Sequence, residues 1–153
     1  MKSKKKNYFL LSVAIALSNI TYSQIKVNSL FSNHMVLQQG VQIPVWGTAE
    51  DNEAITVQFN EQKITTNPQN GKWMVRLKAL PVSNKPQTLF IHSKTNSIEI
   101  KDILVGEVWL CSGQSNMERQ LGLRPPQPPI KDWEKERDEA HYPEIREYYV
   151  PAN

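Results

Sequence analysis

The stretches Ile55-Thr56-Val57-Gln58-Phe59 and Lys72-Trp73-Met74-Val75-Arg76-Leu77 decide the fold of this chain. In both, apolar and polar side chains alternate, so every second residue faces the same side. Alternation at a period of two is typical of a strand with one face in a core and the other toward solvent. We therefore predict a half-buried strand at each of the two stretches.

The sequence on either side extends this pattern into a sheet structure. Leu89 and Ile91 alternate in the same way, and so do residues 98 and 100. Turn-forming residues separate the runs at 50–52, 67–71 and 82–86, and Asn70-Gly71 is the strongest hairpin signal because both residues tolerate a positive φ. Several short strands with regular turns predict a small antiparallel β-sandwich over residues 24–106.

Two tryptophans of this region, Trp46 and Trp73, have two possible roles. An aromatic ring can provide a platform for a sugar, or it can fill the core of the sandwich. We expect both rings in the core.

The first 23 residues have the three-part layout of a secretory signal peptide. Lysines at positions 2, 4, 5 and 6 precede an apolar run of ten residues, 8–17, and cleavage between Ser23 and Gln24 leaves small residues at the −3 and −1 positions. A membrane-spanning helix needs roughly 20 residues, so no lasting membrane anchor is expected. We predict that the chain is exported to the periplasm or the medium.

Removal of this leader changes the charge of the chain. The whole sequence has 18 Lys and Arg against 15 Asp and Glu, a formal net charge of +3. The leader holds four lysines and no acidic residue, so the mature chain has 14 basic and 15 acidic residues and a net charge of −1. The basic character that would favour nucleic acid is therefore lost, and no nucleic-acid partner is expected.

Cysteine and metal-ligand patterns add little to the candidate chemistry. Cys111 is the lone cysteine and cannot form an internal disulfide, and we expect it to be a small buried residue at the end of a strand. Without a cluster of cysteines and histidines at metal-binding spacing, we predict no metal and no cofactor.

Residues 107–153 follow a different pattern. Residues 107–111 predict a buried strand, 112–114 a turn and 116–121 the start of a helix. A proline-rich loop follows, then a helix over 131–140 with Trp133 and Ala140 facing inward, and a strand from Tyr148. Strand, turn and helix are typical of the opening of an α/β unit. A layered domain usually needs about 100 residues or more, so we expect these 47 residues to form an incomplete one.

Ser115 stands at the predicted strand-to-helix junction, where two interpretations compete. A turn of this kind presents a hydroxyl to substrate, and the free N–H groups of a helix start can stabilise an oxyanion. Gly113 would let backbone approach the substrate closely. Alternatively, Ser115 and Glu118 fit the capping-box pattern S-x-x-E at the beginning of a helix.

A serine nucleophile also needs a base, usually a histidine oriented by a carboxylate. The three histidines are His34, His92 and His141, and none has a local context that marks it as that base. We expect each of them to be a surface or packing residue. Arg124 and the proline loop either line a substrate cleft or form a solvated linker.

Several sequence motifs of the chain resemble those of a known family. The stretch from Gly106 to Glu118, with Trp-Leu-Cys-Ser followed by Gly-Gln-Ser-Asn-Met, closely resembles the nucleophile block of the sialate O-acetylesterases. Further resemblance lies in Asn33-His34-Met35-Val36-Leu37-Gln38, in Pro44-Val45-Trp46-Gly47, and in Gly71-Lys72-Trp73 with residue 77. It continues in Tyr142-Pro143-Glu144-Ile145-Arg146 and Val150-Pro151, and extends over nearly all of residues 25–151.

The resemblance implies a fold and an activity. These enzymes are carbohydrate esterases with an SGNH-type α/β/α hydrolase domain, so it implies that residues 107–153 are the start of that domain. With the residue patterns above, we expect a signal peptide at 1–23, a β-sandwich module at 24–106 and this truncated hydrolase domain at 107–153. It implies that Ser115 attacks the acetyl carbonyl of an O-acetylated sialic acid or another acetylated glycan. The N–H of Ser115 would contribute to the oxyanion hole, and Gln114 and Asn116 would shape the turn. In the family the Asp-x-x-His block lies far downstream of the segments matched here, so the resemblance leads us to expect the chain alone to be inactive.

Three hypotheses follow. In the first, the chain is the N-terminal part of an exported serine carboxylic-ester hydrolase that removes acetyl groups from sugars. In the second, residues 24–106 form a β-sandwich that binds carbohydrate or another partner. In the third, the chain is a nonfunctional truncated product, in which the apolar faces of Val108, Leu110 and Trp133 lack a covering layer.

Overall fold

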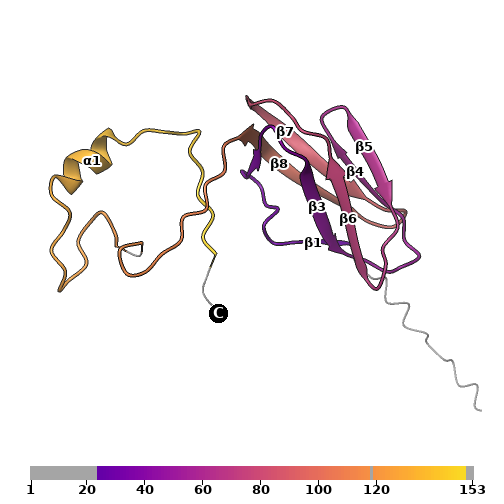
Figure 1. Cartoon of the computed structure of the whole chain (residues 1–153), viewed down its shortest axis with the longest axis horizontal. Coiled ribbons are helices and arrows are strands. Elements are labelled where there is room, and N and C mark those ends of the chain that lie inside the picture. Colours follow the sequence, from indigo (N-terminus) through magenta and orange to yellow (C-terminus); the bar gives the residue numbers. More distant parts are fainter. Residues whose placement is uncertain (1–23, 118, 151–153) are drawn as a thin grey trace, which may run out of the picture.

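The computed structural model describes residues 24–117 and 119–150, which form a two-layered β structure followed by a long extended segment (Figure 1). The predicted leader and Ser23 lie outside the described residues. The elements are β1 (Lys26–Val27), β2 (Val36–Gln38), β3 (Ile43–Thr48), β4 (Ile55–Phe59), β5 (Gln62–Thr66), β6 (Lys72–Leu77), β7 (Ser83–His92), β8 (Ser97–Gly106) and α1 (Trp133–Glu139). All strands of the described residues therefore lie within the region predicted to be a sandwich.

The two layers are a three-stranded and a five-stranded sheet. The first has the order β1-β3-β6 and the second the order β2-β8-β7-β4-β5. Neighbouring strands are antiparallel except β2 and β8, which run parallel with Val36 beside Leu104. The prediction of a purely antiparallel sandwich is thus wrong at this edge. A parallel pair needs a long crossover, and the strands between β2 and β8 in sequence provide it.

The core lies between the two sheets and is built from the predicted alternation. Every second residue of β4 and of β6 is at most 4% exposed, and the residues between them face outward. Burying one large apolar side chain fully contributes about 1.5–3 kcal/mol. The buried residues of these two strands are Ile55, Val57, Phe59, Trp73, Val75 and Leu77.

Both tryptophans of the sandwich occupy the core region, as predicted. Trp73 is 3% exposed, and Trp46 is partly buried and packs against the same cluster. The rings of Trp46 and Phe31 meet edge to face with centroids 4.8 Å apart. The Trp73 ring is therefore too buried to serve as a platform for a sugar.

Two of the three predicted turns form and one does not. Asn70 and Gly71 have φ values of 53° and 74° and make a two-residue reversal between Gln69 and Lys72, which exchange hydrogen bonds of 2.8 and 3.1 Å. Residues 51–52 also form a turn. Residues 83–86 instead begin β7, because Ser83 pairs with Val105 of β8 through a stretch with two register shifts.

Gly47, the next-to-last residue of β3, is needed for the close approach of β1. A Cβ atom at this position would lie 1.9 Å from the carbonyl oxygen of Lys26 and 2.8 Å from the Trp73 ring. Because that oxygen is backbone in a paired strand, we expect Gly47→Ala to destabilise the sandwich by about 1–3 kcal/mol or more through overpacking. Denaturant unfolding measures the loss, and Gly106→Ala is the control because its Cβ would meet only Val36 at 3.5 Å. Equal stability of the two variants would contradict this account.

Residues 107–150 leave the sandwich without forming the predicted strand or the helix start. The strand at 107–111 is absent, and Leu110 is 92% exposed. The described residues of 116–121 form a turn and a bend in place of a helix. A strand needs a neighbour for its backbone N–H and C=O groups, and an apolar face is stabilised only when something covers it. The described residues provide neither, so the α/β part of the expected fold stays a prediction.

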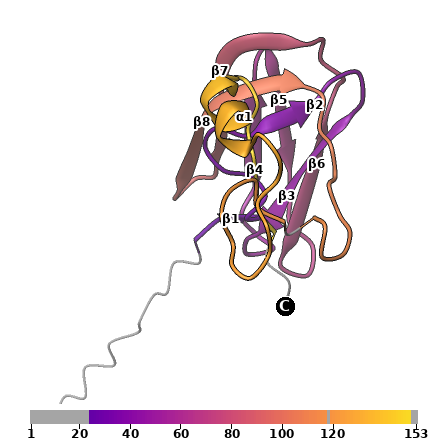
Figure 2. The same cartoon turned by 90° about the vertical axis from the view of Figure 1, so that its left-hand side faces the viewer.

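The helix predicted over 131–140 forms as α1 (Figure 2). None of its residues is buried. Trp133 is half-buried beside Gly122, and the guanidinium carbon of Arg137 lies 5.2 Å from its ring centroid. Ala140 is exposed, so its predicted inward orientation is wrong, and Tyr148 begins no strand. A helix this short is marginal without tertiary packing, which explains why it depends on such local contacts.

Candidate active site

Ser115 lies in a turn on the extended segment, with its side chain exposed. The turn is closed by a hydrogen bond of 2.8 Å that the N–H of Met117 donates to the carbonyl oxygen of Gln114. Asn116 lies in the same turn and accepts a bond of 3.4 Å from the N–H of Arg119. A turn is therefore present at residues 114–117, slightly later than predicted and without the predicted strand and helix on either side, and the serine is not enclosed by packing.

The competing capping interpretation of Ser115 finds no helix to cap. Asn116 and Met117 are turn residues, and Glu118, the fourth member of the pattern, lies outside the described residues. For the same reason, the partial positive charge of a helix start is not available at this turn. Any oxyanion stabilisation must come from individual N–H groups and side chains.

Gly113 has a definite structural role beside the turn. A Cβ atom here would lie 2.6 Å from Cγ of Met117, closer than real Cβ contacts allow. The glycine thus lets the Met117 side chain fold back over the backbone before the turn. In this structure its neighbour is Met117, whereas the sequence predicted a close approach to substrate.

A shallow pocket of about 180 Å³ adjoins the serine. The turn and the proline loop form its two sides, and Nη2 of Arg119 donates a hydrogen bond of 3.1 Å to the carbonyl oxygen of Pro128 across it. Two residues of the proline loop, Gln127 and Pro128, thus line a pocket beside the serine, whereas Arg124 is not among its lining residues, and the predicted substrate cleft stays a prediction. The lining residues are Ser115, Asn116, Arg119, Gln127 and Pro128.

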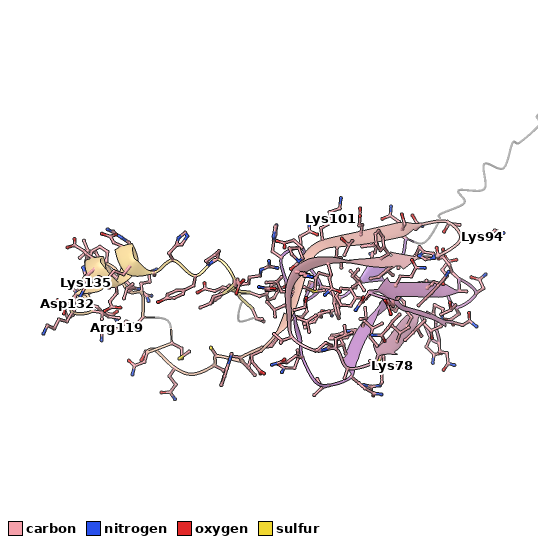
Figure 3. The ribbon with its side chains drawn as sticks, turned by 90° about the horizontal axis from the view of Figure 1, so that it is seen from above. Lys78, Lys94, Lys101, Arg119, Asp132 and Lys135 are labelled. Carbon is pink, nitrogen blue, oxygen red and sulfur yellow. The ribbon has the colours of Figure 1, made fainter. Side chains whose placement is uncertain are left out.

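The sequence singled out neither Gln127 nor Arg119 among the pocket residues, and Arg119 is the charged one. It lies four residues after Ser115, so the spacing could have marked it as a cation near the nucleophile. In Figure 3, Arg119 lies with Asp132 and Lys135 at the end of the molecule away from the sandwich. Lys78 and Lys94 lie at the opposite end, on the sandwich. A guanidinium beside the serine can attract a carboxylate or stabilise negative charge that develops during reaction.

The three histidines lie elsewhere in the described structure, and none lines the Ser115 pocket. His34 pairs through Nδ1 with a carboxylate oxygen of Asp102 on the sandwich, His92 ends β7, and His141 follows α1. The bond from His34, with that from Arg146, holds the pKa of Asp102 below its usual range. This histidine–aspartate pair belongs to the sandwich side of the chain, not to the serine.

The remaining candidate features of this segment are exposed. Cys111 is exposed, so its predicted burial is wrong, because the strand that would have carried it inward is not formed. Over residues 24–117 and 119–150, no three His, Cys, Asp or Glu side chains come together as a metal site. In the same part of the chain, no helix is long and apolar enough to cross a bilayer.

Comparison with known proteins shows which proteins this chain resembles. No protein-family model matches the chain. Among curated proteins, it is 31% identical over 101 residues to the sialate O-acetylesterase of Homo sapiens and 32% identical over 102 residues to that of Rattus norvegicus. Each alignment covers 59% of this chain and 19% of the relative, so the chain spans about a fifth of the length of the curated relatives that it matches.

Comparison with solved structures also finds an esterase. The chain resembles a carbohydrate acetylesterase from Xanthomonas citri with a TM-score of 0.61 and 36% sequence identity. The match covers 63% of this chain and 22% of that chain.

Proposed function

We propose that this chain, which carries a sialate O-acetylesterase-like region, is the N-terminal part of an exported carbohydrate O-acetylesterase. The observation that carries the proposal is the 31% identity over 101 residues to enzymes named for that activity. The proposed substrate is an O-acetylated sialic acid or another acetylated glycan. The proposed reaction is hydrolysis of the acetyl ester.

Ser115 is the proposed nucleophile. Its oxygen forms a bond to the acetyl carbonyl carbon, the bond from that carbon to the sugar oxygen breaks, and the hydroxyl proton passes to the departing sugar. Water then attacks the acetyl-serine, releasing acetate and restoring the hydroxyl. Gly113, Gln114 and Asn116 hold the turn, and Arg119 on the pocket wall supplies positive charge near the developing oxyanion.

A base must come from elsewhere, because an isolated serine hydroxyl is a weak nucleophile. Among the residues that the structure describes, the pocket lining contains no histidine or carboxylate. We therefore propose that a histidine and its orienting aspartate belong to hydrolase sequence outside residues 24–150, and that this chain alone is inactive. Acetate release from O-acetylated sialic acids and from other acetylated sugars tests the activity and distinguishes the substrate classes.

Export by the leader is the remaining part of the proposal. We expect the chain expressed with its leader in a bacterial host to appear outside the cytoplasm with Gln24 as its first residue, because residues 1–23 carry the charge and apolar run of a signal peptide. Intact mass and N-terminal sequencing measure this. Leu11→Arg, which interrupts the apolar run, is expected to leave the uncleaved protein in the cytoplasm. Uncleaved wild-type protein in the cytoplasm would contradict the proposed export.

A further inference from the structure

The 107–150 segment is attached to the sandwich at the point where it leaves β8. The carboxylate of Glu107 accepts hydrogen bonds of 3.1 Å from Nε2 of Gln38 and 2.6 Å from Nε2 of Gln39. The N–H of Val108 donates a bond of 2.8 Å to Oε1 of Gln38. Because both the side chain and the backbone are held, the first two residues of the segment have a fixed direction of exit.

The same segment returns to the sandwich at Arg146, as the yellow end of the chain in Figure 1 illustrates. Nη2 of Arg146 lies 2.9 Å from Oδ1 of Asp102, and Nη1 donates to the carbonyl oxygens of Asp102 and, at 3.4 Å, Met35. The Arg146 side chain is only 17% exposed, in a segment that is otherwise largely open. Tyr148 adds a bond of 3.0 Å from its hydroxyl to the carbonyl oxygen of Ser29.

The surface that receives Arg146 is built by unusual backbone. His34 and Asp102 have φ values of 66° and 56°, a left-handed conformation that is uncommon for residues other than glycine. Such conformations persist where the surrounding structure fixes them and cluster at functional positions. Here the N–H of His34 donates 3.0 Å to the carbonyl oxygen of Lys101, and the N–H of Lys101 donates 2.7 Å to Oδ1 of Asn33.

We infer that residues 33–39 together with Asp102 form a clamp that holds both ends of the segment from 107 to 148, with Ser115 between the two attachments. Gln38 and Gln39 fix the outgoing end, while Asp102, supported by His34, receives the returning Arg146. Holding both ends lowers the conformational freedom of the long stretch between them. The sandwich thereby acts as a positioning scaffold for the serine-bearing segment, and Arg146 is a positioning residue.

The two sides of the clamp lie far apart in the sequence. The clamp residues 33–39 precede the returning arginine by more than a hundred positions, and Met35 and Arg146 are 111 positions apart. The two sequence stretches that resemble one family, 33–38 and 142–146, are therefore the two sides of a single contact. The inference rests on these contacts and not on the esterase activity proposed above.

Spin-label distance measurements on the whole chain test the clamp. In a Cys111→Ser background, labels are attached at Lys94→Cys and Tyr149→Cys, two exposed positions on the sandwich and on the returning end. We expect one narrow distance distribution in this parent. Arg146→Gln is expected to broaden it to the spread of a flexible chain, about 5–6 Å multiplied by the square root of the number of released residues.

Asp102→Asn supplies the second arm, because asparagine tolerates the left-handed backbone that Asp102 adopts. We expect Asp102→Asn to broaden the distribution as Arg146→Gln does, and the double variant to be no broader than either single one, since both remove the same contact. Arg137→Gln, an exposed arginine on α1, is the matched control and is expected to leave the narrow distribution.

The melting temperature of the sandwich is measured for each variant and is expected to stay at the parent value, because neither Arg146 nor Asp102 belongs to the buried core. Broadening at constant melting temperature supports the clamp. A broad distribution in the parent, a narrow one in both clamp variants, or equal broadening by Arg137→Gln would overturn it.

Discussion

Replacing Ser115 with alanine in a longer protein that continues this chain through a hydrolase region is expected to lower acetate release by about 10³- to 10⁶-fold. The reason is that the variant loses the only group proposed to form the covalent acetyl intermediate. Residual turnover above the uncatalysed rate is expected from substrate binding and oxyanion stabilisation. Release of acetate from an O-acetylated sialic acid measures the effect.

Ser112→Ala is the matched control for this experiment. Ser112 is an exposed serine in the same segment, three residues before Ser115, and it does not line the pocket. We expect it to retain activity close to that of the parent. The 153-residue chain itself is expected to release no acetate above background. Turnover by the short chain that disappears in Ser115→Ala would show that the base lies within it and would refute the proposed division of the site.

Phe59→Ala is expected to have the largest effect on stability, about 3–5 kcal/mol. Phe59 is 1% exposed and ends β4, where it pairs with Leu89 on one side and Gln62 on the other. Removing the ring leaves a cavity between the two sheets that neighbouring strands cannot refill. Because small domains have only about 5–15 kcal/mol of stability in total, the variant is expected to be close to unfolding at room temperature.

Phe90→Ala is the control, since Phe90 is the same residue type on the adjoining strand β7 and is 43% exposed on the outer face. We expect its unfolding free energy to change by no more than about 1 kcal/mol. Urea denaturation followed by tryptophan fluorescence compares the two variants. If they lose similar amounts of stability, the assignment of the inner face of β4 to the core is wrong.

The sequence pattern predicted the sandwich well where the signal lies in neighbouring residues. The alternation in β4 and β6 fixed which residues are buried, and Asn70-Gly71 marked a reversal because its backbone requirement is written in two adjacent residues. Residues 82–86 misled the prediction because serine, asparagine and proline suit an irregular strand beginning as well as a turn. The parallel pairing of β2 with β8 has no local signature, since Val36 and Leu104 are far apart in sequence.

Of the candidate site, the sequence predicted the position of the serine but not the residues and elements around it. The strand–turn–serine wording identified Ser115 and the bend, but the strand and helix on either side need a covering layer that the described residues lack. Arg119 was missed because its relevance depends on the proline loop folding back to Pro128. The meeting of Asp102 with Arg146 was equally hidden, because two isolated charged residues 44 positions apart carry no common pattern.

The parallel pairing of β2 with β8 also limits how early the five-stranded sheet can form. The edge strand at 36–38 has no partner until residues 104–106 have been synthesised, so the five-stranded sheet cannot be completed before then. Contacts between residues so distant in sequence form slowly. If the leader directs this chain across a membrane, this late pairing favours a polypeptide whose five-stranded sheet is still incomplete when it reaches the translocation channel.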